Sequence, residues 1–155
     1  MFWNLGHDEE EEFLEPSSVQ GRYKEACDLI AKASKHSDFD AMSRTKIERH
    51  LRRLLERAPY FELLYVTDAA GAQVIDNIAG PNFRAQYDGT GLGQDWSERP
   101  WYLAAVKARG AIVSPVYKSL ATGELTLTIA HPIRRKIIRY LGVLAVDIGM
   151  KGMLR

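Results

Sequence analysis

The chain has 155 residues, which is enough for one domain with a substantial core and too short for two comfortable ones. Its 21 basic and 20 acidic residues give a net charge of +1, so the charge balance gives no reason to expect a nucleic acid or an acidic surface as partner. The single cysteine, Cys27, excludes an internal disulfide. The four histidines (His7, His36, His50 and His131) are scattered without metal-ligand spacing, so we expect neither a zinc site nor a cofactor.

Residues 1–16 carry an acidic run at positions 8–12, bracketed by aromatic and apolar residues. We expect a flexible tail with solvated charges, and the alternative is a docking peptide. The segment has no basic flank and no apolar stretch of the kind found in secretory signals. Nowhere does the sequence approach the run of about 18 apolar residues that a membrane span needs.

Residues 17–58 are predicted to form two amphipathic helices. The first begins after Ser17 or Ser18 and places apolar residues at helical spacing: Val19, Tyr23, Ala26, Cys27, Ile30 and Ala33. The sequence SDFD at positions 37–40 is expected to end this helix and to cap the second one. The second helix has a basic face that is either solvated or faces an acidic partner, formed by Arg44, Lys46, Arg49, Arg52 and Arg53.

Residues 60–150 are predicted to hold the sheet. Alternating or continuous apolar segments indicate five strands, at positions 61–68, 74–80, 111–119 with an interruption at Pro115, 123–133 and 139–150. Turns are expected at 68–73 and 121–123, and a glycine-rich loop with a short helical turn at 80–94. The pattern predicts an α+β domain with an antiparallel sheet. The two helices are expected on one face, and the long connection between the second and third strands, the excursion, on the other.

The segment at positions 95–117 concentrates aromatic and cationic side chains: Trp96, Arg99, Trp101, Tyr102 and Tyr117. Trp and Tyr supply rigid apolar walls with one polar group each, and Arg supplies a planar fork that binds a carboxylate at two points. Pro100 favours the first turn of a helix that Gly110 ends. This composition is typical of a recognition site.

Three motifs occur in order along the chain: RPWY, SPVYKSLATGELTLTIAHPI and YLGVLAVDIGM. Together they closely resemble the Cache family of ligand sensors, whose PAS-like fold is also called PDC, over roughly residues 60–150. The resemblance implies a PAS-like five-stranded antiparallel sheet preceded by amino-terminal helices, in a single sensor domain at positions 17–155. It also implies a role in signal transduction.

Asp147 lies in an otherwise apolar strand, where a carboxylate needs a cation or hydrogen-bond donors. An internal ion pair with Arg99 is one interpretation. The resemblance implies another, in which Arg99 and Trp101 hold the carboxylate of an amino-acid ligand and Asp147 accepts its amine. Tyr102 and Tyr117 then match the aromatic positions of the family's pocket.

Gln94 departs from the amino-acid-binding pattern, which has a Tyr five residues before the Arg; Trp96 lies close by. The amide still offers a hydrogen-bond donor but removes one aromatic wall. Amino acids, small amines, short carboxylates and purines therefore all remain candidate ligands.

The alternative to a sensor is a related domain without ligand that acts as a dimerisation or adaptor module. That hypothesis predicts an exposed apolar stripe on the amino-terminal helices. A homodimer through these helices is expected under either hypothesis, because related sensors pair in this way, and the signal must pass to a partner protein.

The sequence shows no nucleophile with a base, no pair of acids and no set of metal ligands. We therefore expect no enzyme activity. We expect a cytoplasmic protein if the chain is complete, because it opens with Met1 and lacks a signal and a span. Cache domains are mostly extracytoplasmic parts of receptors, so an extracytoplasmic location is expected if the chain is a receptor fragment.

Overall fold

The computed structural model describes residues 21–119, 123–136 and 138–150. The predicted acidic tail at 1–16 lies outside the described residues, as do positions 121 and 122 of the predicted turn. No helix in the described ranges combines the length and the apolar character that crossing a bilayer requires.

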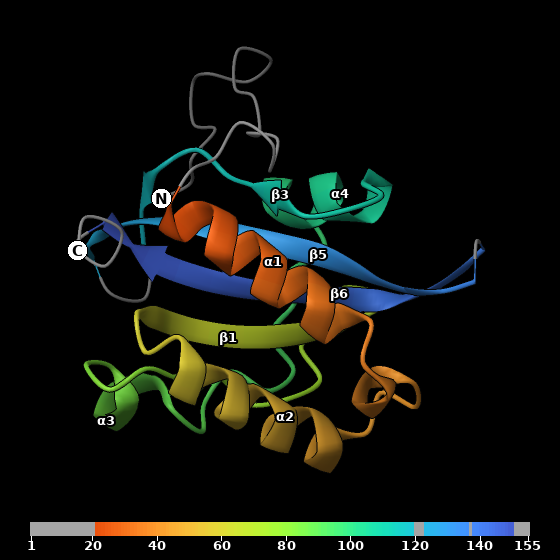
Figure 1. Cartoon of the computed structure of the whole chain (residues 1–155), viewed down its shortest axis with the longest axis horizontal. Coiled ribbons are helices and arrows are strands. Elements are labelled where there is room, and N and C mark those ends of the chain that lie inside the picture. Colours follow the sequence, from red (N-terminus) through yellow and green to blue (C-terminus); the bar gives the residue numbers. More distant parts are fainter. Residues whose placement is uncertain (1–20, 120–122, 137, 151–155) are drawn as a thin grey trace.

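The centre of the domain is an antiparallel sheet in the order β2-β1-β6-β5-β3, with β4 also paired to β5 (Figure 1). Its strands are β1 (Phe61–Asp68), β2 (Ile78–Ala79), β3 (Ile112–Val113), β4 (Tyr117–Lys118), β5 (Leu125–Arg135) and β6 (Arg139–Gly149). The antiparallel α+β fold is thus confirmed, whereas the count of five strands is corrected to six. The predicted strand at 111–119 divides at Pro115, which has no N–H to donate to a ladder.

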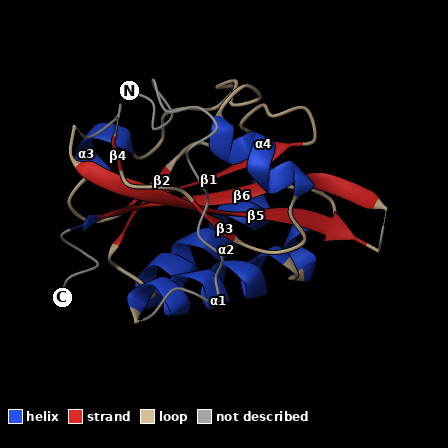
Figure 2. Cartoon of the chain, turned by 90° about the horizontal axis from the view of Figure 1, so that it is seen from above, coloured by secondary structure: helices blue, strands red, loops and turns tan. Residues whose placement is uncertain are grey.

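Helices α1 (Arg22–Ser34) and α2 (Arg44–Arg57) cover one face of the sheet, as predicted (Figure 2). Alternate residues of the long strands point towards them and form an aliphatic core with the apolar sides of the helices; its strand residues include Leu64, Val66, Ile129, Leu144 and Val146. All of these strand side chains are fully buried. This face supplies most of the apolar burial that stabilises the fold.

The connection between the two helices differs from the prediction. SDFD forms a short 3₁₀ helix, η3 (Ser37–Phe39), and does not cap α2. Ser43 caps α2 instead, with its side chain accepting from the backbone N–H of Lys46 at 3.5 Å. The chain between these elements turns through Met42, which has a left-handed backbone with φ 51°.

The basic face of α2 meets acidic residues of the loops. Arg44 pairs with Asp76 at 2.8 Å, and Arg52 pairs with Asp88 at 3.2 Å. Half of each arginine side chain is exposed, so these ion pairs add little to the stability of the fold. Their main effect is to position the loop segments that carry Asp76 and Asp88.

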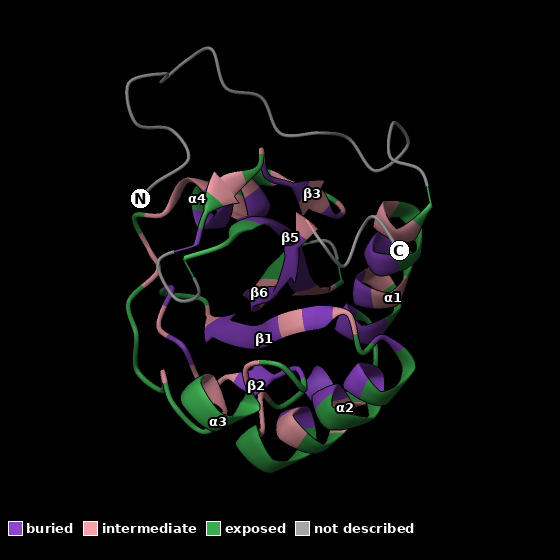
Figure 3. Ribbon diagram, turned by 90° about the vertical axis from the view of Figure 1, so that its left-hand side faces the viewer, coloured by how far each residue is buried: buried purple, intermediate pink, exposed green. Residues whose placement is uncertain are grey.

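The excursion between β2 and β3 covers the other face and includes α3 (Arg84–Tyr87) and α4 (Pro100–Lys107). Pro100 occupies the first turn of α4, as predicted, because its fixed φ suits a helix start and its missing N–H is not needed there. Figure 3 shows that β1 and β6 are buried between the two covering layers. The excursion side is aromatic: Tyr65 of β1 packs there with Trp101 and Tyr102 of α4.

Candidate ligand-binding site on the sheet

Asp147 lies in the middle of the sheet, between Leu63 of β1 and Thr128 of β5 in the strand register. Its side chain faces the excursion and is 7% exposed. The hydroxyl groups of Tyr65 and Thr128 donate to its Oδ1 at 2.8 and 2.9 Å. Among the residues that the structure describes, no group donates to its Oδ2.

Burial raises the pKa of Asp147 from 3.8 to about 6, although the hydrogen bonds from Tyr65 and Thr128 act in the opposite direction. Asp147 forms no ion pair with Arg99 or any other cation of the described ranges. The internal ion pair considered above is therefore not formed, and two neutral hydroxyls satisfy one oxygen of a buried carboxylate.

Three aromatic rings stand beside this carboxylate. The centroid of the Tyr65 ring lies 5.3 Å from that of Trp96 and 5.7 Å from that of Trp101, and the two Trp rings are 5.7 Å apart. The indole N–H of Trp96 donates to Oε1 of Gln73 at 2.9 Å, which fixes its ring. The indole N–H of Trp101, a residue only 2% exposed, donates no hydrogen bond within the described part of the chain.

Arg99 lies directly before the first helical residue of α4, and its guanidinium carbon is 5.6 Å from the centre of the Trp96 ring. Partial burial lowers the pKa of Arg99 from its ordinary value, while Tyr117 and Tyr65 act in the opposite direction. The hydroxyl of Tyr117 lies 2.6 Å from that of Thr128, so a chain of hydrogen bonds leads from Tyr117 through Thr128 to Asp147. The structure thus places an arginine, four aromatic residues and a buried carboxylate around one region of the sheet.

Two of the predicted site residues are placed differently. The hydroxyl of Tyr102 donates to the carbonyl of Ala69 at 3.0 Å and accepts from Tyr140 at 2.9 Å, so its polar group serves the fold. The side chain of Gln94 is exposed, and its hydrogen bonds are made by its backbone, which donates to Gly91 and accepts from Gln73. The structure therefore does not bring Gln94 into the cluster.

Tyr65 and Gln73 were missed by the sequence reasoning. A tyrosine inside the apolar strand FELLYVTD was the available signal, because a buried hydroxyl needs a partner. Gln73 gave no signal beyond its place in a turn. His131 lies on the opposite face of the sheet, where its Nδ1 is 3.1 Å from Oγ of Ser34 in α1.

A separate open cavity of about 720 Å³ lies at the start of β1, and its lining includes Tyr60, Glu62, Phe83 and Glu124 but neither Arg99 nor Asp147. Oε1 of Glu62 is buried without a hydrogen-bond partner in the described ranges. Burial raises the pKa of Glu62 to about 7, with smaller contributions from the charges of Asp147 and Glu124. This region of the sheet therefore carries acidic side chains that are hard to ionise.

Comparison with solved structures shows the same fold in chemoreceptor sensor domains. The ligand-binding domain of the Campylobacter jejuni chemoreceptor Tlp3 in complex with 4-methylisoleucine is 15% identical, with a TM-score of 0.70 over 89% of this chain and 55% of that one. The ligand-binding domain of the Pseudomonas aeruginosa amino-acid chemoreceptor PctC in complex with GABA is 25% identical, with a TM-score of 0.64 over 89% and 58%. The chain thus spans little more than half of these domains.

Among curated proteins, the chain is 29% identical over 137 residues to a citrate (Re)-synthase of Syntrophus aciditrophicus. The match covers 86% of this chain and only 22% of that protein. A family model described as methyl-accepting chemotaxis protein-like, first PDC sensor domain, matches residues 47–154. The chain therefore belongs to the PDC sensor domains of the chemoreceptor type, a family of ligand-binding domains in signal transduction.

Proposed function

We propose that this domain senses a small zwitterion, an amino acid or a related amine with a carboxylate, and that it does so without catalysis. The observation that supports this most directly is Asp147, a buried carboxylate that has no cationic partner among the described residues and accepts their hydrogen bonds at one oxygen only. Such a group destabilises the fold unless a cation compensates it. A ligand ammonium group is a cation of the right size to reach Oδ2.

The surrounding residues suit the rest of such a ligand. The faces of Tyr65, Trp96 and Trp101 attract cations and pack against methylene groups. Arg99 and the indole N–H of Trp101, which donates to no described residue, are donors for a carboxylate. The solved domains of similar fold hold 4-methylisoleucine and GABA, which both carry an amine and a carboxylate and so support this assignment.

The adaptor hypothesis has less support. It predicts an exposed apolar stripe on the amino-terminal helices, but the exposed large apolar residues of the described ranges lie elsewhere, at Leu92, Leu103, Val116, Leu125 and Ile138. The apolar sides of α1 and α2 face the sheet. A homodimer and a downstream signalling partner remain part of the proposal.

A thermal-shift screen tests the ligand class. The purified protein is heated with single amino acids, GABA, simple amines, short carboxylates that include citrate, and purines. A ligand at 100 times its Kd stabilises the folded state by about 2.7 kcal/mol, which is several degrees in Tm for a domain of this size. We expect a rise with compounds that carry both charges and none with the amine or the carboxylate alone.

Two variants then locate the ligand. Asp147→Asn keeps the shape of the side chain but removes its charge, and Arg99→Gln removes the guanidinium; each is expected to weaken binding by about 100-fold, since breaking a desolvated charge pair costs about 3 kcal/mol. Asp28→Asn and Arg49→Gln, on the exposed faces of α1 and α2, are the charge-matched controls. Binding that is equal in all four variants would place the ligand elsewhere and contradict the proposal.

A further inference from the structure

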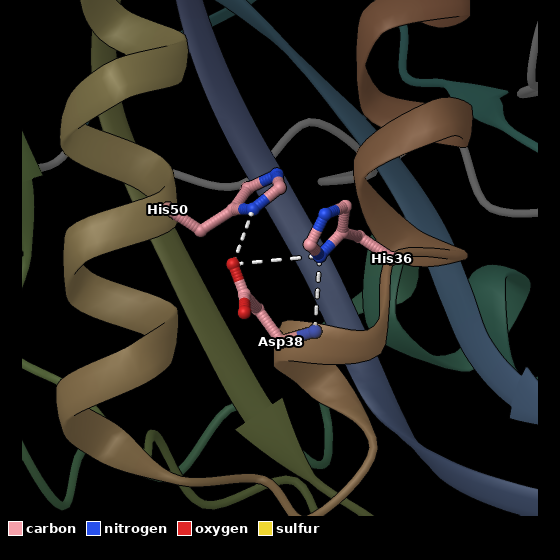
Figure 4. Close-up of side chains that lie close together, drawn as sticks. All are labelled: His36, Asp38 and His50. Atoms are coloured by element: carbon pink, nitrogen blue, oxygen red, sulfur yellow. Dashed lines mark hydrogen bonds and ion pairs between the residues drawn. The ribbon is translucent and has the colours of Figure 1, made fainter.

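His36, Asp38 and His50 meet at the join between the two amino-terminal helices (Figure 4). His36 lies just before η3, Asp38 lies within it, and His50 lies in the middle of α2. The residues show no metal-ligand spacing along the chain, because His36 and His50 lie 14 positions apart and only the turn of the chain brings them together. This is a correction to the expectation that the histidines are scattered.

The distances suit a single metal ion. Oδ2 of Asp38 is 3.0 Å from Nδ1 of His50 and 3.4 Å from Nδ1 of His36, and the possible ligand atoms all lie within 4.8 Å of one another. A tetrahedral zinc ion with bonds of about 2.0–2.1 Å holds its ligand atoms about 3.3 Å apart. The His36 side chain is 49% exposed, so its ring is free to rotate towards this geometry.

The groups also have the required charge and access. Asp38 offers a carboxylate oxygen, which is a usual zinc ligand beside the imidazole nitrogens of two histidines. The side chains of Asp38 and His50 are each 17% exposed, so water has access for a fourth ligand position.

The hydrogen bond between Nδ1 of His50 and Oδ2 of Asp38 must lose its proton before both atoms bind a metal. Two further contacts must also yield. Nη2 of Arg53 lies 3.6 Å from Oδ2 of Asp38, but this arginine is 63% exposed and can turn into solvent. The backbone N–H of Asp38 donates to Nδ1 of His36 at 3.0 Å in an exposed position, where water can replace the acceptor. Neither contact is buried, so both are weak competitors.

We propose that His36, Asp38 and His50 bind one divalent transition-metal ion of the class that prefers imidazole, with zinc as the probe. The ion joins the end of α1 to α2. Its effect extends to the sheet, because Arg135 of β5 donates to the carbonyl of His36 at 2.9 Å and to Oδ1 of Asp40 at 2.6 Å. This site is separate from the Asp147 cluster, so the proposal of metal binding does not depend on the proposed ligand.

The test is a titration of the chelator-treated, untagged protein with zinc sulfate, followed by calorimetry and by competition with a chromophoric chelator. We expect one zinc ion per chain and a rise in Tm, since a metal that binds the folded state stabilises it. Cobalt(II) in place of zinc should give the visible absorption of a low-symmetry, four-coordinate ion.

Three variants remove one ligand each: His36→Gln, Asp38→Asn and His50→Gln. Each is expected to weaken zinc binding by at least about tenfold to 100-fold, which is the loss seen when even an outer partner of a ligand is removed. Glu48→Gln, which removes a carboxylate two positions from His50, is the matched control and should bind as the parent does. Arg53→Ala removes the competing cation and should tighten binding.

His36 is exposed, so His36→Gln keeps the fold even if His50→Gln does not. The other metal-binding candidates are His7 and the acidic run at 8–12. Zinc affinity that is unchanged in His36→Gln and Asp38→Asn would place the ion there and overturn the proposal, as would the absence of a stoichiometric zinc ion in the parent protein.

Discussion

The two faces of the sheet have opposite chemistry, although they belong to the same strands. Towards the helices, β1, β5 and β6 present fully buried aliphatic residues such as Leu64, Ile129 and Leu144. Towards the excursion, the neighbouring positions present aromatic rings, hydroxyl groups and the carboxylate of Asp147. A strand alternates its side chains between faces, so a single segment serves both purposes.

In this domain, one face of the sheet mainly supplies stability and the other carries the groups suited to recognition. The helix face buries mostly carbon against carbon, with few hydrogen bonds such as that between His131 and Ser34. The excursion face keeps a carboxylate to which no described residue brings a cation, which weakens the fold and leaves an interaction to be completed by another molecule. The predictions below test this division.

The largest effect is expected from two adjacent leucines of β1. Leu64 packs in the aliphatic core and Leu63 packs with the aromatic cluster, and both are buried. Leu64→Ala should lower the free energy of unfolding by about 2–5 kcal/mol, because it leaves a cavity among side chains that cannot collapse. The ligand affinity of the molecules that remain folded should not change.

Leu63→Ala is the size-matched counterpart and borders Asp147 in the register. It should weaken ligand binding, because the aromatic rings that pack with Leu63 lose part of their support and are held less firmly in place. Denaturant unfolding and ligand titration of both variants provide the measurement. If the two variants change stability and affinity in the same proportion, the two faces do not divide their roles.

Asp147→Asn should stabilise the protein at neutral pH. The pKa of Asp147 is about 6 in the folded state and 3.8 ordinarily. Between these values the folded state holds a proton that the unfolded state has lost, so the free energy of unfolding falls as pH rises through this window. At about 1.4 kcal/mol for each unit of pKa, the ionised group costs about 3 kcal/mol above pH 6.

The asparagine retains an Oδ1 that accepts from Tyr65 and Thr128, so the variant removes the charge and keeps the hydrogen bonds. Urea unfolding of variant and parent between pH 4 and 8 should give a difference that is near zero at pH 4 and largest above pH 6. Taking the difference cancels the contribution of His131, whereas Glu62 adds to the difference, because the charge of Asp147 that raises the pKa of Glu62 is absent from the variant. A difference that does not vary with pH would mean that Asp147 is ionised throughout.

The fold was predictable because it depends on periodicity. The apolar patterns at 61–68, 123–133 and 139–150 correspond closely to β1, β5 and β6. The second predicted strand at 74–80 proved much shorter: only Ile78 and Ala79 form a strand against β1, and the backbone of Asn77 instead bonds to Gly89 and Thr90 of the excursion. Pairing at an edge depends on neighbours that are distant in sequence, so local pattern does not reveal it.

Parts of the candidate site were predictable, namely those where a residue differs in chemistry from its neighbours in the sequence. Asp147 stood out as a charge in an apolar strand, and Trp96, Arg99 and Trp101 as a cluster within one short segment. Tyr65 and Gln73 gave weaker signals because Tyr is common in strands and Gln is common in turns. The pair of His36 and His50 gave none, since only the turn through η3 brings them together.

The smallest effect concerns the loop that holds the aromatic cluster. Gly71 has a left-handed backbone with φ +91°, and a Cβ on it would lie 2.8 Å from the Cα of Ser97. Its carbonyl accepts from the backbone N–H of Trp96 at 2.9 Å. Gly71→Ala should therefore move the segment that carries Trp96 and weaken ligand binding, with a loss of about 1–2 kcal/mol in stability.

Gly93→Ala is the matched control, because Gly93 has a similar φ of +89° but nothing within 4 Å of the added Cβ. The control has the backbone strain without the collision, so a ligand titration of both variants measures what the contact with Ser97 contributes. If both glycine variants bind the ligand equally well, the position of Trp96 does not matter for recognition, and the aromatic wall belongs to the fold alone.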